Sequence, residues 1–190
     1  MSEHSERLID PILQRRSPRA FAEREPSGEQ LRLLFEAARW AASSFNGQPW
    51  RYIVVRRSEG APFEDALAGL IPANRSWAQA APVVGFSLAR THFANGKVNH
   101  HAWHDLGAAT AQLSIQAASM GLMIHQMGGI EREVVRERFA VPAELDVVAG
   151  FVIGWPGDPA SLAEPLQERE LAPRSREPLE TILLRGPFEP

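Results

Sequence analysis

The segment from Ser43 to Pro49 carries two hydroxyls, two side-chain amides, a glycine and a proline within seven residues. It joins an amphipathic segment to the strand-like run RYIVV at 51–55. A helix-to-strand loop of this kind can hold polar groups on a rigid frame where they meet a ligand. The same residue types also serve ordinary turns, so composition alone does not decide between a binding loop and a turn.

A second group of chemically competent residues lies near the N-terminus. Arg15, Arg16, Ser17 and Arg19 fall within five residues, and Pro18 stops the preceding helix. Guanidinium and hydroxyl groups at this density are typical donors to a phosphate, although a solvated basic patch has the same composition. Two further guanidiniums, Arg174 and Arg176, lie far away in the sequence.

The histidines are weaker candidates for a metal site or a catalytic base. His100 and His104 would share one helical face beside Asp105, but no HExxH pattern and no obvious fourth ligand accompany them, so we predict no metal site. His125, in an apolar run, is expected to be a packed residue rather than a catalytic base.

Composition excludes several classes of protein. The 190 residues suit one domain, and the net charge of −3 with a pI near 6.1 provides no basic field for nucleic acid. The absence of cysteine removes disulfides, thiol nucleophiles, Fe–S clusters and Cys-ligated zinc. The polar N-terminus resembles no targeting signal, and no apolar run is long enough to span a bilayer. We therefore expect a soluble cytoplasmic protein with no membrane partner.

The elements that must position these residues follow from periodicity. A short helix is predicted over 5–16, and a second begins at Ser27, where Gln30 completes a capping box. Gly121 is expected to end an Ala-rich helix that begins near Leu106. Other predicted elements are strands at 51–57, 82–88, 122–130 and 147–154, a short helix and connection at 61–81, and a surface helix at 131–139. Core-facing positions of the second helix are Leu31, Leu34, Phe35, Ala38 and Ala42.

Two features suggest burial by another surface. The segment from Leu106 to Met123 is apolar or small all round, which predicts either a central helix of one subunit or a helix partly buried by a second subunit. After residue 160 the chain is Pro-rich and charged and cannot form a core of its own, so it is either disordered or an arm laid on another surface.

Taken together, six motifs in order resemble the nitroreductase family of FMN-dependent oxidoreductases. The resemblance extends from residue 14 to about residue 185. The motifs are RRSPR (15–19), SSFNGQPW followed by RYIVV (43–55), NRSW before APVV (74–84), DLGAA (105–109), HQMGG (125–129) and PRSREPL (173–179). One departure is Ala42, where many members have proline.

The resemblance implies an α+β fold with a mixed β-sheet flanked by helices, in an intertwined homodimer. Residues 1–190 would form a single FMN-binding domain, with about 160–190 as a C-terminal extension packed on the partner subunit. Two FMN sites would lie at the dimer interface.

The resemblance also assigns candidate roles. The first arginine cluster would contact the phosphate, ribityl chain and ring edge of FMN, and the 43–46 loop would reach the flavin of the partner subunit. An asparagine would meet the isoalloxazine edge, a glycine pair would pass near the ring and N5, and the distal arginines would hold the phosphate. The first cluster is Arg15, Arg16, Ser17 and Arg19, and the loop residues are Ser43, Ser44 and Asn46. The asparagine is Asn74, the glycine pair is Gly128 and Gly129, and the distal arginines are Arg174 and Arg176.

The implied activity is a ping-pong transfer of electrons from NADH or NADPH through flavin N5 to a nitroaromatic, quinone or similar small acceptor. Because the flavin performs the chemistry, no catalytic side chain is assigned. Two alternatives stay open: a relative with other flavin chemistry, such as dehalogenation or dehydrogenation, and a non-catalytic flavin-binding redox protein. The short connections at 61–80 and 91–103 argue mildly against the first alternative. The sequence does not distinguish NADH from NADPH.

Overall fold

A four-stranded sheet forms the centre of the computed structural model, which describes residues 7–183 and residue 186. The strands are β1 (Trp50–Arg56), β2 (Val83–Arg90), β3 (Met123–Met127) and β4 (Leu145–Gly154), in the order β1-β2-β4-β3. Every pair is antiparallel, from Trp50 opposite Ala89 at one edge to Met123 opposite Gly154 at the other. The predicted α+β class is therefore confirmed, whereas the described strands do not form the mixed sheet that we expected.

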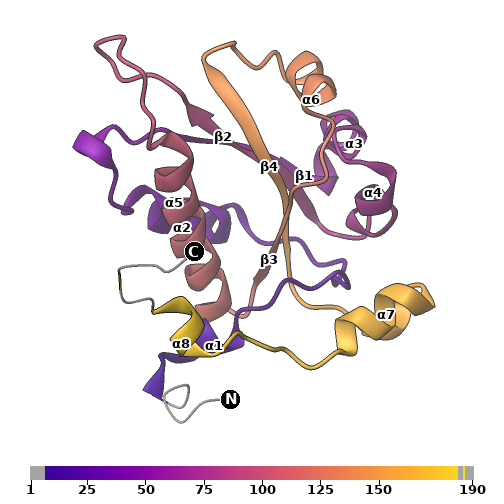
Figure 1. Cartoon of the computed structure of the whole chain (residues 1–190). Helices are drawn as coiled ribbons and strands as arrows, with labels where there is room; N and C mark the ends of the chain where they lie inside the picture. The colour runs from indigo at the N-terminus through magenta and orange to yellow at the C-terminus, as the bar shows by residue number, and fades with distance from the viewer. Residues whose placement is uncertain (1–6, 184–185, 187–190) are drawn as a thin grey trace.

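Helices cover both faces of the sheet (Figure 1). On one face lie α3 (Ala61–Ala68), α4 (Pro72–Ala78) and α6 (Arg132–Arg138), packed with Val84, Phe86 and Leu88 of β2. On the other lie α2 (Gly28–Arg39) and α5 (Ala102–Ser119), packed with Val83 and Ala89. Because successive side chains of a strand point to opposite faces, the apolar run of β2 feeds two separate cores.

Helix α2 begins as the sequence predicts. The Gln30 N–H donates to the Ser27 hydroxyl at 3.1 Å, and the Ser27 N–H donates to the Gln30 side chain at 2.9 Å. Leu31, Leu34 and Ala38 are buried. The expectation for Ala42 was wrong: α2 ends at Arg39, and Ala42 lies beyond it and is exposed.

Helix α5 begins at Ala102, four residues before the predicted start at Leu106, and ends at Ser119. Gly121 ends it as predicted, with φ +75°: its N–H donates to the Ala118 carbonyl, and the Leu122 N–H donates to the Ala117 carbonyl. The helix is not buried all round in one chain, because Gly107 and Ala111 are exposed.

The first and last helices of the described chain belong to segments that lie against each other, since Arg174 donates to the Leu13 and Arg15 carbonyls. Helix α1 (Asp10–Gln14) is shorter than the predicted 5–16 helix, and residues 1–6 lie outside the described residues. After β4 come η4 (Pro159–Ser161), α7 (Glu164–Leu171) and α8 (Leu179–Ile182), none of which contains a buried residue. Of the predicted extension, 184–185 and 187–190 also lie outside the described residues.

Candidate functional site

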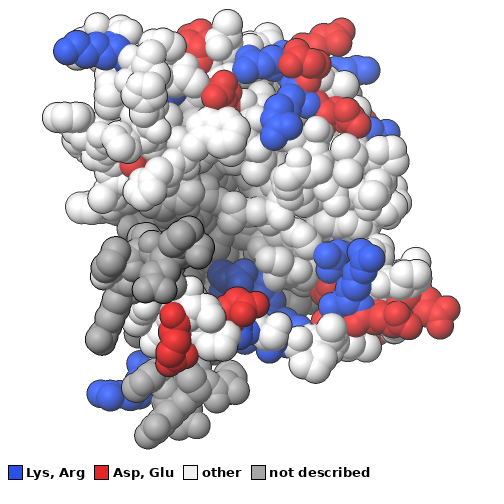
Figure 2. Space-filling view, in the orientation of Figure 1, with Lys and Arg blue, Asp and Glu red and all other residues white. Residues whose placement is uncertain are grey.

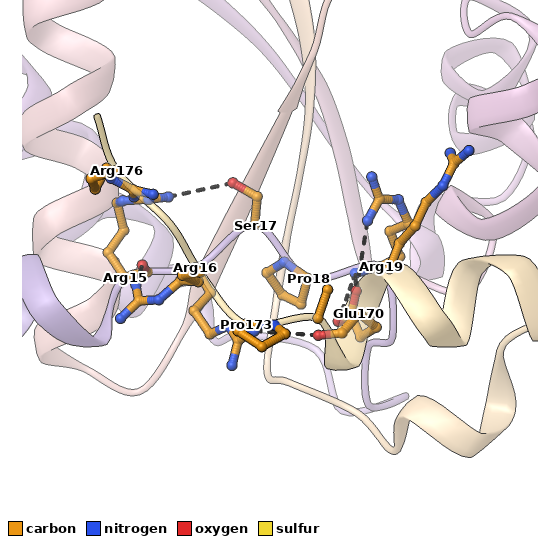
Figure 3. Close-up of a pocket in the computed structure, with 11 residues that line it drawn as sticks. Arg15, Arg16, Ser17, Pro18, Arg19, Glu170, Pro173 and Arg176 are labelled. Carbon is orange, nitrogen blue, oxygen red and sulfur yellow. Dashed lines mark hydrogen bonds and ion pairs between the residues drawn. The ribbon is translucent and has the colours of Figure 1, made fainter. Parts of the chain in front are cut away.

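Both arginine clusters line one cavity of about 360 Å³ at the base of the molecule. Figure 2 shows the basic side chains gathered in a recess in the lower part of this face, and Figure 3 shows the lining residues in detail. Arg15 and Arg176 lie on one side of the cavity, while Arg19 and Glu170 lie on the other. The described residues that line it are Arg15, Arg16, Ser17, Pro18, Arg19, Arg169, Glu170, Ala172, Pro173, Arg174 and Arg176.

The end of α1 holds Arg174, one of the two distal arginines, at the cavity. Arg174 donates from Nη1 to the Arg15 carbonyl at 2.8 Å and from Nη2 to the Leu13 carbonyl at 2.5 Å. Carbonyls at a helix C-terminus have no partner within the helix, so a guanidinium is well suited to satisfy them. Arg174 therefore holds the C-terminal segment to the first arginine cluster.

The cavity concentrates positive charge. Burial, and then the charges of Arg176 and Arg174, lower the pKa of Arg15. The Arg15 guanidinium also donates to the Ser17 hydroxyl at 3.4 Å. Like charges held this close are relieved by an anion, and planar guanidiniums bind phosphate oxygens in pairs.

Side chains of the edge strand β3 hold the 15–19 loop in place. The Arg16 N–H contacts the Met123 sulfur at 3.4 Å, and His125 donates from Nδ1 to the Pro18 carbonyl at 2.9 Å. The ring of His125 packs on Trp77 of α4, with 4.6 Å between the centroids. Burial lowers the pKa of His125. His125 is thus packed, as expected, and donates to the loop.

Helix α4 brings Asn74 to the glycine pair. The Asn74 amide donates to the Gly129 carbonyl at 2.9 Å. A Cβ at Gly129 would lie 2.5 Å from Ile71 Cδ1 and 2.7 Å from Asn74 Nδ2, so a larger residue would require both side chains to shift. A Cβ at Gly128 would meet no atom within 4 Å, which leaves space for a ligand there. Asn74 and Gly129 are thus in contact, with Gly128 adjacent in the chain, and none of the three lines the arginine cavity.

The 43–48 loop lies in a different part of the molecule, at the upper left of Figure 1 and far from α1. Within it, η2 (Ser44–Asn46) contains Phe45 at φ 51° and Asn46 at φ 53°, and Gln48 follows at φ 44°. Non-glycine residues rarely adopt this conformation, and it persists where surrounding contacts enforce it. None of the predicted loop residues Ser43, Ser44 and Asn46 lines the arginine cavity of the same chain.

Two hydrogen bonds to side-chain oxygens help to hold this strained loop. The Ser44 N–H donates to Oδ2 of Asp105 at 2.9 Å, and the Gln48 N–H donates to the Ser43 hydroxyl at 3.1 Å. Asp105 lies in the first turn of α5 and is 3% exposed. This contact uses the Ser44 backbone and not its hydroxyl.

No metal centre accompanies the histidine-rich segment in the described part of the chain: no group of three or more His, Asp or Glu side chains could hold an ion there. His104 contacts the Asp105 carboxylate at 3.1 Å. Within the same residues, no helix has both the length and the hydropathy needed to cross a bilayer.

Residues 12–92 match the model of the nitroreductase family. A crystal structure described as an oxidoreductase containing FMN superimposes with a TM-score of 0.91 at 34% identity, covering 100% of this chain and 96% of that one. This chain belongs to the nitroreductase family.

Two sequence relatives extend the similarity. An uncharacterized 15.4 kDa protein of Mycolicibacterium smegmatis is 35% identical over 142 residues, which are 72% of this chain and 95% of the relative. A putative NADH dehydrogenase/NAD(P)H nitroreductase of Archaeoglobus fulgidus is 27% identical over 161 residues, or 80% of this chain and 87% of the relative.

In this nitroreductase-family chain, the structure separates the predicted residues into three groups: the arginine cavity, the Asn74–Gly129 contact and the 43–48 loop. It also adds residues that the sequence did not reveal as part of the site, namely Met123, Asp105, Trp77 and Glu170. Asp105 opens the DLGAA motif, which could have drawn attention to it. Trp77 likewise closes the NRSW motif, whereas Met123 and Glu170 had no distinguishing signal.

Proposed function

We propose that this chain is an FMN-dependent oxidoreductase that takes electrons from NADH or NADPH and passes them to a nitroaromatic, quinone or similar small acceptor. The observation that carries the proposal is the arginine cavity, which is built from residues 15–19 and 169–176 together. The family membership and the FMN named for the similar crystal structure support the choice of cofactor.

The donor set of the cavity suits the phosphate end of FMN. A phosphate monoester carries about two negative charges near neutral pH, and the lining supplies six arginines against one carboxylate. Arg15, Arg174 and Arg176 would hold the phosphate, because their charges crowd at one side. Arg16 and Ser17 would complete this end.

The other side of the cavity suits the ring. Arg19 lies there, and a guanidinium near N1 and C2=O would stabilise the negative charge of the reduced ring. Asn74 and Gly129 form a second contact surface, and the open space at Gly128 allows a flat ring to approach the backbone. These residues bind and orient the ring; none is assigned a proton transfer.

When bound, FMN supplies the hydride chemistry, accepting electrons from the nicotinamide in one half-reaction and giving them to the acceptor in the next. The protein then needs to hold the ring, limit water and leave one face open to two successive substrates. The absence of an assigned acid–base pair is consistent with this division of labour.

The functional unit would be a homodimer in which residues 1–190 of each copy form one FMN-binding domain. Glu170 and Arg174 bond to the arginine loop and to α1 of their own chain, so only the part of the 160–190 extension beyond them would pack on the partner. Three observations support the homodimer: Gly107 and Ala111 leave a face of α5 uncovered, α7 and α8 bury no residue, and the 43–48 loop presents polar groups away from its own arginine cavity. In the dimer, Ser43, Ser44 and Asn46 would reach the flavin held by the other copy.

The test is spectroscopic. The purified protein should bind FMN and show a visible flavin spectrum, and anaerobic NADH or NADPH should bleach it before an acceptor restores it. Parallel reactions with free FMN at equal concentration provide the control. A colourless preparation that does not bind added FMN would overturn the proposal, and a flavin that neither nucleotide reduces would overturn the oxidoreductase activity.

A further inference from the structure

Glu170 of α7 supplies the one carboxylate among the described residues that line the arginine cavity. Its side chain is 10% exposed, which is unusual for a charged group on a helix that buries no residue. A buried carboxylate among arginines would normally be interpreted as an ion pair. The contacts indicate a different role.

The main partner of Glu170 is a backbone group. Both carboxylate oxygens lie 3.0 Å from the Arg19 N–H, whereas the Arg19 guanidinium is 3.9 Å from Oε2. The Glu170 carbonyl also accepts from Arg16 Nη2 at 3.3 Å. A bond to the backbone N–H fixes the position of the loop, whichever rotamer the Arg19 side chain adopts.

The loop is therefore held from two directions. From the sheet, Met123 contacts the Arg16 N–H and His125 donates to the Pro18 carbonyl. From α7, Glu170 accepts the next backbone N–H, that of Arg19. Arg174 and Arg176 follow four and six residues after Glu170, and Arg174 is bonded to the end of α1.

We propose that Glu170 is a positioning residue for FMN binding: it docks α7 on the arginine loop, so that Arg19 faces the ring and the two distal arginines lie beside Arg15. This inference rests on the proposed function. It assigns to an acidic residue a favourable effect on the binding of an anion.

Charge alone predicts the opposite effect. A carboxylate in the cavity repels a phosphate, so its removal would tighten anion binding if Glu170 acted only through its charge. If it acts by geometry, removal of the acceptor frees the Arg19 N–H and the arm, and FMN binding weakens. The two roles therefore differ in the sign of the change.

Two substitutions separate these roles. Glu170→Ala removes the charge and the acceptor, whereas Glu170→Gln removes the charge but keeps one oxygen that can accept from Arg19. Glu168→Ala is the matched control, because Glu168 is an exposed residue on the same helix. The midpoint of thermal unfolding of each variant verifies that the domain is folded.

The dissociation constant of FMN, measured by flavin fluorescence, should rise about tenfold in Glu170→Ala, as expected for the loss of a charged hydrogen bond. Glu170→Gln should bind FMN as tightly as the wild type or more tightly, and Glu168→Ala should match the wild type. In the apo-protein, trypsin should cleave after Arg174 several-fold faster in Glu170→Ala than in Glu168→Ala.

Tighter FMN binding by Glu170→Ala would overturn the inference, and so would equal weakening by Glu170→Ala and Glu170→Gln. The proposed function fails separately, if the wild-type protein does not bind FMN. In that case the trypsin comparison still tests the docking of α7, because it needs no ligand.

Discussion

The arginine cavity and the 43–48 loop both carry residues predicted to meet the same cofactor, yet only the cavity is assembled within one chain. Arg174 bonds directly to the backbone of the first cluster, so residues about 160 positions apart form one surface. The loop residues instead lie beside Asp105 and Phe93, with Phe45 93% exposed at the tip.

The two regions also hold different kinds of unfavourable energy. In the cavity, Arg15 lies near the charges of Arg174 and Arg176. In the loop, Phe45, Asn46 and Gln48 hold backbone conformations that cost about 1–3 kcal/mol each. An anion would relieve the first, whereas the second is maintained by the fold. This difference fits the proposal that the cavity binds the phosphate within one chain and that the loop acts on the other copy.

The largest effect is expected from the distal arginines. Arg174→Ala combined with Arg176→Ala should weaken FMN binding by about 100-fold or more, because two charged contacts of about 1.5–3 kcal/mol each are lost. Equilibrium titration with FMN measures the change. The FMN affinity of the variant with lysine at both positions should lie between those of the wild type and the double alanine variant, since lysine keeps the charge without paired donors. Unchanged FMN occupancy on gel filtration would exclude the arm from phosphate binding.

A mixing experiment tests whether the loop acts on the other copy. One chain carries Arg174→Ala and Arg176→Ala, and the other carries Ser44→Ala and Asn46→Ala. Co-expression with two affinity tags isolates the mixed dimer. If each loop serves the partner's flavin, one site combines all four substitutions and the other is intact, so reductase activity should return to about half of wild type.

The same experiment can show that each loop serves the flavin of its own chain and not that of the partner. If each loop serves its own chain, both sites of the mixed dimer carry one defect, and its activity should be the mean of the two parent homodimers. Homodimers of each variant, purified with the same tags, provide the reference. A monomeric wild-type protein at the concentrations of the assay would remove the basis of the prediction.

The elements of the fold followed from local signals where these were strong. The capping box at Ser27 and Gln30, the apolar strands and the helix stop at Gly121 all depend on residues close in sequence. The early start of α5 was missed because residues 95–105 show no apolar period. Asn99 assists this start through its contact with the His101 N–H. The antiparallel order of the sheet depends on pairings between distant strands, which periodicity does not encode.

The site was predictable only in part for the same reason. The arginines formed two recognisable clusters, and the resemblance to a family joined them. Glu170 had no such signal: α7 also contains Glu164 and Glu168, and all three look alike in the sequence. Only the approach of α7 to the Arg19 N–H distinguishes one carboxylate from the others.

Asp105 provides a smaller, structural test of the loop. Asp105→Ala leaves the Ser44 N–H without its acceptor, and it should lower the free energy of unfolding by about 1–3 kcal/mol. It should reduce activity far more than it weakens FMN binding to the cavity, since the cavity does not include this loop. Urea unfolding and FMN titration on the same samples measure both effects. An equal loss of FMN affinity and activity would show that the two regions are not separate.

The smallest effect concerns His125, which anchors the cavity side to the sheet. Burial, and then the charge of Arg19, lower its pKa, while the Pro18 and Ser17 backbone and Glu170 oppose this shift. The unfolded chain therefore binds a proton before the folded chain, and the free energy of unfolding contributed by neutral His125 falls as the pH drops below about 6.5. The contribution is fully present above that pH and is lost as the pH falls through the lowered pKa.

His125→Gln keeps a donor for Pro18 but cannot titrate, so the difference in unfolding free energy between wild type and variant should change between about pH 8 and about pH 5. Urea unfolding at one fixed protein concentration measures this difference. If the difference in unfolding free energy between wild type and His125→Gln stays constant across that pH range, His125 does not link protonation to the stability of the arginine loop.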